Sequence, residues 1–326
     1  SYSVKGLPKK LSHFQKTQKR RKIMEIFDHG KWIWVKGLDK PNTYVSFRTA
    51  FEAGGDESVI MFISAETDYA VYINGEFVDC NQYPDYPFDK VYDKLNVSKY
   101  CVGGNCVNEL RIDVYHQGTD SSTRRAEAPG LIFEIRKNSR VISFSDGSVS
   151  AELIDEYDMG REVELVTGQL GYSFRYDKRR SKHTVCETVV CDKPLPIRER
   201  PIKKLVIGSD ETVSVKTAGS FVDCGGYTIG QRMQDASLAY SASPIDVTLP
   251  SEQGIEFCAK EGSDGVYVIL DTGRENAGFF SIDIDVPDDC LISIPETQKS
   301  ITPESKPPIT RLMKNMYLSV RTLSTI

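Results

Sequence analysis

Short apolar segments recur along the chain with the two-residue period of β-strands. In residues 109–115 the even-numbered positions are apolar through Val114, and the odd-numbered ones are mostly polar. This alternation is typical of a strand with one buried face. Similar segments rich in β-branched and aromatic residues occupy 44–51, 59–63, 70–73, 131–136 and 141–144. Many short strands separated by turn residues indicate a sandwich or a barrel.

Turn residues show how these strands connect. Asn74-Gly75 separates 70–73 from 76–79, and this dipeptide is the strongest short signal for a two-residue hairpin. Three prolines interrupt the pattern within 192–201. Because proline cannot donate to a ladder, that segment is predicted to be a linker or an edge segment between domains.

The strand pattern then resumes and ends before the C-terminus. Strands are predicted at 204–207, 212–217, 245–249, 265–271 and 279–286. Apolar residues in 309–320 have helical spacing, which predicts an irregular or helical tail. The predicted fold is all-β, with two antiparallel β-sandwiches. The expected organisation is a polar arm over 1–30, a first sandwich over 31–200, a second over 201–298 and a tail over 299–326.

Charge and hydropathy exclude several classes of partner. Lys and Arg number 41 and Asp and Glu number 46, so the net charge is −5. A mildly acidic chain does not favour nucleic acid or an anionic membrane as its main partner. No run of eighteen apolar residues is present, so no membrane span is expected. The chain begins at Ser1 without an apolar leader, and we expect a signal peptide to be absent or already removed.

Histidine and cysteine do not form a metal-binding pattern. The four histidines are isolated, and two cysteine pairs, Cys101/Cys106 and Cys186/Cys191, have a wider spacing than zinc knuckles. We therefore predict no metal and no cofactor. Free thiols in a reducing compartment are the expected state of the eight cysteines, which slightly favours a cytoplasmic location over a periplasmic or secreted one.

No catalytic machinery is recognisable in the sequence. A nucleophile elbow and a phosphate-binding loop are both missing from it. Glycoside hydrolysis needs two carboxylates across the scissile bond, and no acidic pair stands out among the 46 acidic residues. We predict no catalytic residue in this chain.

Two aromatic residues are candidates for carbohydrate binding. Trp32 and Trp34 are separated by two positions, so on a strand they would point to the same face. Exposed indole rings stack on sugar rings, because C–H groups of the sugar contact the π-face. Tryptophans at the start of a sandwich also serve as core residues, and the sequence leaves both alternatives open.

A long polar loop supplies the other candidates. Residues 116–129 lie between two predicted strands and are rich in charged side chains. Loops at the ends of a sandwich often carry binding residues. The candidate carbohydrate-binding residues here are Asp120, Arg124, Arg125 and Glu127.

Four parts of the sequence form a recognisable series: Trp32-Ile33-Trp34 with 45–51, the hairpin region 64–78, 92–98 and 267–279. Together they resemble the N-terminal accessory domains of bacterial α-L-rhamnosidases of glycoside hydrolase family 78. It implies a galactose-binding-like jelly roll followed by a second sandwich.

The resemblance also implies where the chemistry would be. In that family the general acid and base lie in an (α/α)6 barrel, which these 326 residues do not contain. The leading hypothesis is a non-catalytic region that scaffolds this barrel and binds carbohydrate. Its expected partners are the barrel and rhamnose-containing glycans. The alternative hypothesis is a stand-alone carbohydrate-binding or adhesion-like protein without an enzymatic parent.

Overall fold

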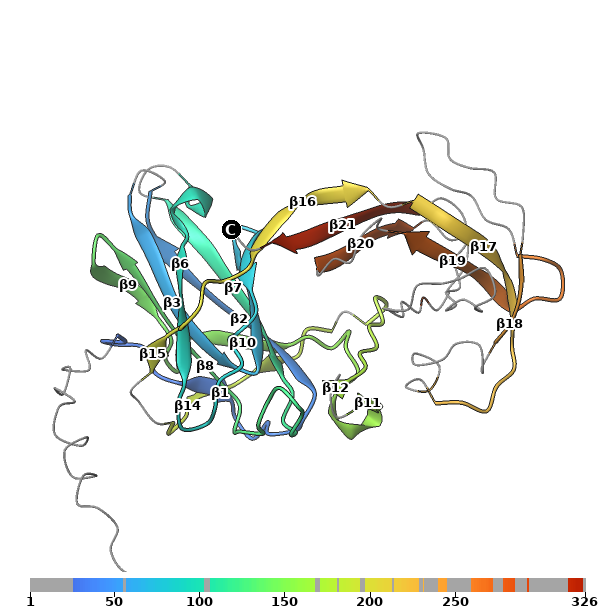
Figure 1. Ribbon diagram of the computed structural model, residues 1–326. Coiled ribbons are helices and arrows are strands. Elements are labelled where there is room, and N and C mark those ends of the chain that lie inside the picture. Colours follow the sequence, from blue (N-terminus) through green and yellow to red (C-terminus); the bar gives the residue numbers. More distant parts are fainter. Residues whose placement is uncertain are drawn as a thin grey trace, which may run out of the picture. The chain divides into compact units, whose positions relative to one another are not determined.

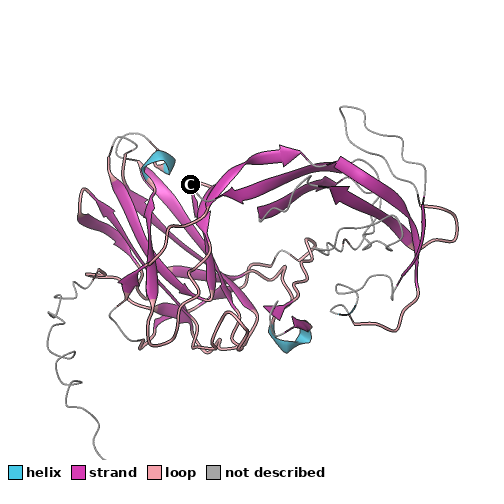
Figure 2. Ribbon diagram, in the orientation of Figure 1, coloured by secondary structure: helices cyan, strands magenta, loops and turns pink. Residues whose placement is uncertain are grey.

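The predicted all-β class is confirmed, because almost every regular element of the described chain is a strand (Figure 2). The computed structural model describes residues 26–54, 57–102, 106–167, 171–180, 182–193, 197–212, 214–228, 231, 240–244, 259–271, 278–284, 292 and 316–324. Within these residues no helix is long and apolar enough to cross a membrane. Most of the predicted arm, 1–30, lies outside the described residues.

The chain divides into two compact units. The first comprises Ser1–Tyr157 and Lys178–Arg200, and the second comprises Asp158–Asp177 and Pro201–Ile326. The span predicted for the first sandwich, 31–200, is thus interrupted by a segment that belongs to the second unit.

The first unit contains two sheets that enclose a common core (Figure 1). The seven-stranded sheet has the order β14 (Thr188–Val190), β1 (Ile33–Val35), β8 (Gly130–Lys137), β3 (Val59–Glu66), β6 (Val91–Asn96), β15 (Arg198–Glu199), with β9 (Arg140–Phe144) also beside β8. The six-stranded sheet has the order β13 (Val185–Cys186), β10 (Ser150–Leu153), β2 (Thr43–Glu52), β7 (Val107–His116), β4 (Asp68–Ile73), β5 (Glu76–Cys80).

Sequence alternation correctly predicts the buried face of β7. Its even-numbered residues, Asn108 to His116, are all buried, whereas the odd-numbered ones are exposed or half-buried. The Asn74-Gly75 hairpin is confirmed between β4 and β5. Both turn residues have positive φ angles, 52° and 81°, which is the backbone that a tight two-residue hairpin requires.

The central strands of the seven-stranded sheet have buried apolar residues on both faces. Leu131, Phe133 and Ile135 of β8 belong to the main core between the sheets. Ile132, between them in the sequence, belongs to a second cluster with Phe27, Trp32, Phe62, Tyr92 and Ile197. Because successive side chains of a strand point to opposite faces, this second cluster covers the outer face of the sheet.

The proline-containing segment ends in an edge strand. β15 pairs in parallel with β6, with Arg198 opposite Val91 and Glu199 opposite Tyr92. The amide of Arg198 donates to the carbonyl of Lys90 at 3.0 Å. The segment before Pro201 therefore belongs, at these positions, to the edge of the first sandwich.

The second unit contains antiparallel sheets. One has the order β16 (Val206–Thr212), β21 (Met316–Ser324), β20 (Gly278–Ile284), and another has the order β18 (Tyr240–Pro244), β17 (Ser214–Asp223), β19 (Gly265–Asp271). A two-stranded sheet joins β11 (Leu165–Thr167) and β12 (Gly171–Tyr172). The 3₁₀ turn Gly160–Glu162 also belongs to this unit, whereas the 3₁₀ turn Ser98–Tyr100 belongs to the first unit. The strand predicted at 245–249 lies outside the described residues.

The tail differs from its prediction. Met316–Ser324 is the strand β21, which pairs with both β16 and β20, and not a helix. Two neighbouring strands supply its backbone groups with partners, so pairing outweighs the helical spacing of its apolar residues. The preceding part of the predicted helix, 309–315, lies outside the described residues.

Replacing an inward residue of β7 should destabilise the first sandwich far more than replacing an outward one. For Ile112→Ala, which empties space in the main core, we expect a loss of about 2–5 kcal/mol in the free energy of unfolding. Val107→Ala alters an exposed side chain of the same strand and should change it by less than about 0.5 kcal/mol. Denaturant unfolding followed by tryptophan fluorescence measures this, because both tryptophans of the chain lie in this unit. Equal losses would contradict the assigned faces.

Candidate functional site at one end of the first sandwich

Charged side chains gather at the end of the first sandwich where β3 and β7 finish. Glu66 is the last residue of β3 and pairs with Gly130, the first residue of β8. Lys90 immediately precedes β6, and His116 ends β7. Since neighbouring antiparallel strands run in opposite directions, these strand ends meet at one place. The 117–129 loop connects β7 to β8 there.

The ammonium of Lys90 is the centre of this cluster. It lies 2.8 Å from Glu66 Oε2, 2.8 Å from Asp85 Oδ1 and 3.2 Å from Glu127 Oε2. All four side chains are almost completely removed from solvent. Burial alone would lower the pKa of Lys90, but the facing carboxylates outweigh it and raise that pKa above its usual value. The raised pKa keeps Lys90 protonated at neutral pH.

A second lysine links the cluster to Trp32. The Nζ of Lys193 lies 3.1 Å from Glu127 Oε1 and donates to the carbonyl of Ala128 at 2.5 Å. The same ammonium lies 4.7 Å from the centre of the Trp32 ring, a cation–π distance. Burial lowers the pKa of Lys193 despite the attraction of Glu127 and Glu66.

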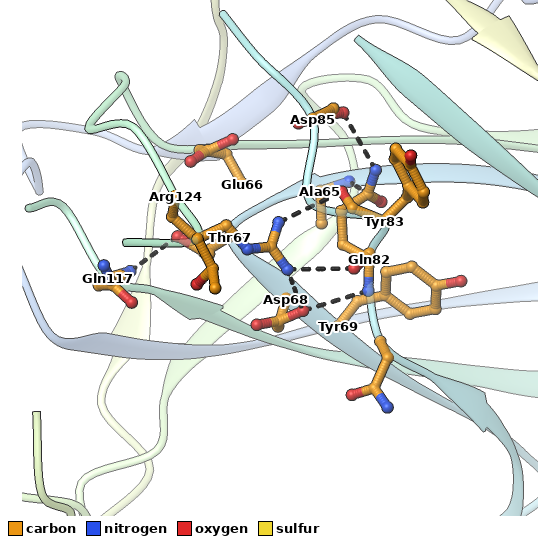
Figure 3. Close-up of polar contacts among 12 residues, drawn as sticks. Ala65, Glu66, Thr67, Asp68, Tyr69, Gln82, Tyr83, Asp85, Gln117 and Arg124 are labelled. Carbon is orange, nitrogen blue, oxygen red and sulfur yellow. Dashed lines mark hydrogen bonds and ion pairs between the residues drawn. The ribbon is translucent and has the colours of Figure 1, made fainter. Parts of the chain in front are cut away.

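Arg124 fastens the 117–129 loop to the sandwich (Figure 3). Its Nη2 donates to Asp68 Oδ1 at 2.9 Å and to the Gln82 carbonyl at 3.0 Å, and its Nη1 donates to the Tyr83 carbonyl at 3.3 Å. Gln82 is buried and in turn donates to the Val91 carbonyl at 2.7 Å. The guanidinium thus ties the loop to the sandwich end through three hydrogen bonds from Nη1 and Nη2.

His116 is buried beside this network. Its ring packs against Trp34 with the centroids 6.0 Å apart, and its Nδ1 makes no hydrogen bond within the described residues. Burial, reinforced by the positive charge of Lys193, lowers its pKa to about 4, while Asp39 and Glu127 oppose the shift. His116 is accordingly neutral at pH 7.

The structure places the six candidate residues in four different settings. Trp32 belongs to the cluster on the outer face of the seven-stranded sheet, whereas Trp34 belongs to the main core. They do not share a face as predicted, because Trp32 precedes the strand Ile33–Val35 and its alternation does not extend to it. Both indoles are buried, so neither ring face is open to a sugar.

The four loop candidates also separate. Arg124 and Glu127 are committed to the internal contacts described above. Asp120 and Arg125 remain exposed, 3.7 Å apart, and Asp120 accepts a hydrogen bond from the Ala126 amide at 2.7 Å. Of the loop candidates, these two are the ones that face solvent.

Sequence reasoning missed the residues that organise this end, namely Glu66, Asp85, Lys90, Lys193 and His116. One of them carried a usable signal. His116 continues the even-numbered inward row of β7, so alternation alone would have placed it inside. The others come from separate segments, and nothing in the local sequence connects them.

Comparison with known proteins reveals similarity of fold only. No family model matches the sequence, and no curated protein matches it. A family 78 rhamnosidase from Bacillus sp. GL1 superimposes with a TM-score of 0.54 at 18% identity, over 59% of this chain and 22% of the enzyme. At this identity the similarity establishes a sandwich fold like that of part of the enzyme. The chain spans about a fifth of the enzyme's length.

Two further α-L-rhamnosidases give weaker superpositions. The protein from Dictyoglomus thermophilum has a TM-score of 0.42 at 13% identity, over 77% of this chain and 37% of that one. The protein from Aspergillus terreus has a TM-score of 0.40 at 13% identity, over 80% and 38%. These TM-scores are too low to support an argument about either unit.

Removing the buried ammonium should destabilise the first sandwich strongly. Lys90→Met removes the cation paired with Glu66 and Asp85 and leaves Glu127 with Lys193 alone, and we expect a loss of about 3–5 kcal/mol in the free energy of unfolding. Lys36→Met is the matched control, because Lys36 pairs with Glu187 at 2.8 Å on the surface, where such pairs contribute less than about 1 kcal/mol. Tryptophan fluorescence in urea measures both. A similar loss for the two variants would show that the buried cluster is not an anchor.

His116 should make the first sandwich sensitive to acid. Its pKa is about 4 in the folded chain against 6.5 normally, so the unfolded state binds more protons between these pH values. The contribution of His116 to the free energy of unfolding is therefore fully present above about pH 6.5. It falls by about 3 kcal/mol on acidification to pH 4. His116→Gln should remove this part of the pH dependence, whereas His29→Gln, on the surface, should retain it. Parallel pH profiles for wild type and His116→Gln would contradict the assignment.

Proposed function

We propose that this chain is a non-catalytic region of an α-L-rhamnosidase-like glycoside hydrolase, which scaffolds a catalytic barrel outside this chain and binds carbohydrate. The observation that carries the proposal is the sandwich fold shared with part of a family 78 rhamnosidase over 59% of this chain. It agrees with the independent resemblance of the sequence segments to the accessory domains of that family. The proposed partners are rhamnose-containing glycans and the barrel of the parent enzyme.

The arrangement of carboxylates at the sandwich end supports a non-catalytic role. Hydrolysis of a glycosidic bond requires an acid and a second carboxylate on opposite sides of the sugar, with access for substrate. Glu66, Asp85 and Glu127 instead surround the ammonium of Lys90 at 2.8–3.2 Å and are shielded from solvent. All three carboxylates are paired with this ammonium inside the protein and are therefore inaccessible to a substrate.

A scaffold role also fits the double coverage of the seven-stranded sheet. Apolar side chains of 26–32 and Ile197 cover part of its outer face, in addition to the main core between the two sheets. Such a unit presents a rigid surface on which loops can hold a ligand or a second domain. A preformed support loses little conformational entropy when a partner docks.

The purified chain should bind sugars and should not cleave them. We expect no release of aryl alcohol from an aryl α-L-rhamnoside above the buffer rate, and retention on a glycan array that includes rhamnose-terminated oligosaccharides. A dissociation constant on the order of 1 mM is expected for a monosaccharide, because one sugar ring offers few contacts.

The non-catalytic role and the carbohydrate-binding role would be contradicted by different results. Turnover that disappears when a single acidic residue is replaced would refute the non-catalytic role. Absence of retention on every glycan would refute the carbohydrate-binding role and leave the scaffold role to be judged by association with a rhamnosidase barrel.

A further inference from the structure

Two exposed aromatic rings are displayed side by side between β5 and β6. Phe88 is 86% exposed, more than any other large apolar side chain in the described part of the chain, and Tyr86 is 53% exposed. Their ring centroids lie 5.4 Å apart and the ring planes differ by 10°. The rings are therefore stacked on each other in a parallel arrangement while remaining open to solvent. We call residues 85–90 the aromatic turn.

The aromatic turn is held firmly although its rings are exposed. The amide of Asp89 donates to the Tyr86 carbonyl at 2.9 Å, and the two residues form an isolated β-bridge. Asp85 accepts hydrogen bonds from Lys90 Nζ and from the Val91 amide, each at 2.8 Å. The buried ionic cluster thus anchors both ends of the turn. A ligand that binds here would not have to order it first.

Charged groups suited to hydroxyl recognition lie next to the rings. Arg198 donates to both carboxylate oxygens of Asp89, from Nε at 2.6 Å and from Nη2 at 2.9 Å. Both side chains are more than 40% exposed. A guanidinium carries five N–H groups, of which this pair uses two, and each carboxylate oxygen can accept a second hydrogen bond. Donors and acceptors in a fixed geometry therefore adjoin an apolar surface.

The size of the apolar surface distinguishes a sugar from a protein partner. Two aromatic side chains offer at most about 300–500 Å² of contact area, which is less than the roughly 800 Å² that each partner buries in a standard protein interface. A pyranose ring needs only one or two aromatic faces. Its C–H groups carry partial positive charge and contact the negative π-face, while its hydroxyls project from the ring edge toward polar groups.

We propose that the stacked rings of Tyr86 and Phe88 form a platform in which the outer face of one ring contacts a pyranose ring, whose hydroxyl groups hydrogen bond to Asp89 and Arg198. This inference rests on the proposed carbohydrate-binding function and gives it a location. The location differs from the sequence-based candidates, of which Trp32 and Trp34 are buried. The turn nevertheless adjoins the 117–129 loop, because Arg124 binds the carbonyls of Gln82 and Tyr83 just before it.

The test measures binding of methyl glycosides to the full chain by isothermal titration calorimetry and saturation-transfer NMR. The probes are methyl α-L-rhamnopyranoside and the methyl pyranosides of galactose, glucose and mannose. Phe88→Ala should weaken binding at least tenfold, and Tyr86→Ala should also weaken it. Phe88→Trp should keep or improve binding, because the indole ring of tryptophan offers a larger stacking face than the phenyl ring. Since Phe88 is so exposed, its replacement should leave the unfolding transition unchanged.

A matched control separates the platform from exposed aromatic residues in general. Phe174 is 71% exposed and belongs to the second unit, so Phe174→Ala should bind sugars like the wild type. Wild-type binding that persists in Phe88→Ala and Tyr86→Ala would overturn the platform and leave the carbohydrate-binding function intact. A wild-type chain that binds none of the methyl glycosides would overturn both. Equal weakening by Phe174→Ala would also overturn the platform.

Discussion

The buried ammonium of Lys90 determines how one end of the first sandwich is built. Three carboxylates from three separate segments approach it to 2.8–3.2 Å. Each of these charges would be costly to bury alone, and together they satisfy one another. The end of β3, the start of β6 and the 117–129 loop are thereby brought to one point. The 117–129 loop, which the sequence predicted to bind carbohydrate, therefore contributes Glu127 and Arg124 to the internal contacts that hold this end together.

This internal use of charge explains which side chains remain for a ligand. Arg124 and Glu127 are bound within the protein, and Trp32 lies under the ammonium of Lys193. The network leaves Asp120 and Arg125 at the surface, together with the aromatic turn that it anchors, in which the rings of Tyr86 and Phe88 are stacked and exposed. The buried ionic cluster holds the aromatic turn in place, and the turn exposes its two rings to solvent. A preformed turn of this kind lowers the entropic cost of binding a small ligand.

Tertiary pairing decided several features that the sequence left open or indicated wrongly. Met316–Ser324 has apolar residues at helical spacing, yet it is a strand because β16 and β20 flank it. Trp32 and Trp34 have the spacing of a common face, but the strand begins only at Ile33, so they enter different clusters. In both cases the local pattern was compatible with two structures, and distant segments selected one.

The sequence by itself determined the all-β class, the buried row of β7 and the Asn74-Gly75 hairpin, because these depend on residues a few positions apart. Local periodicity and turn chemistry act over that range. The ionic cluster was decided only by the tertiary structure. Lys90 meets Glu66 and Glu127 across 24 and 37 positions of sequence, and no local pattern records a contact of that length. The partners of a buried charge are set by which strand ends coincide, and that follows from the pairing of whole sheets.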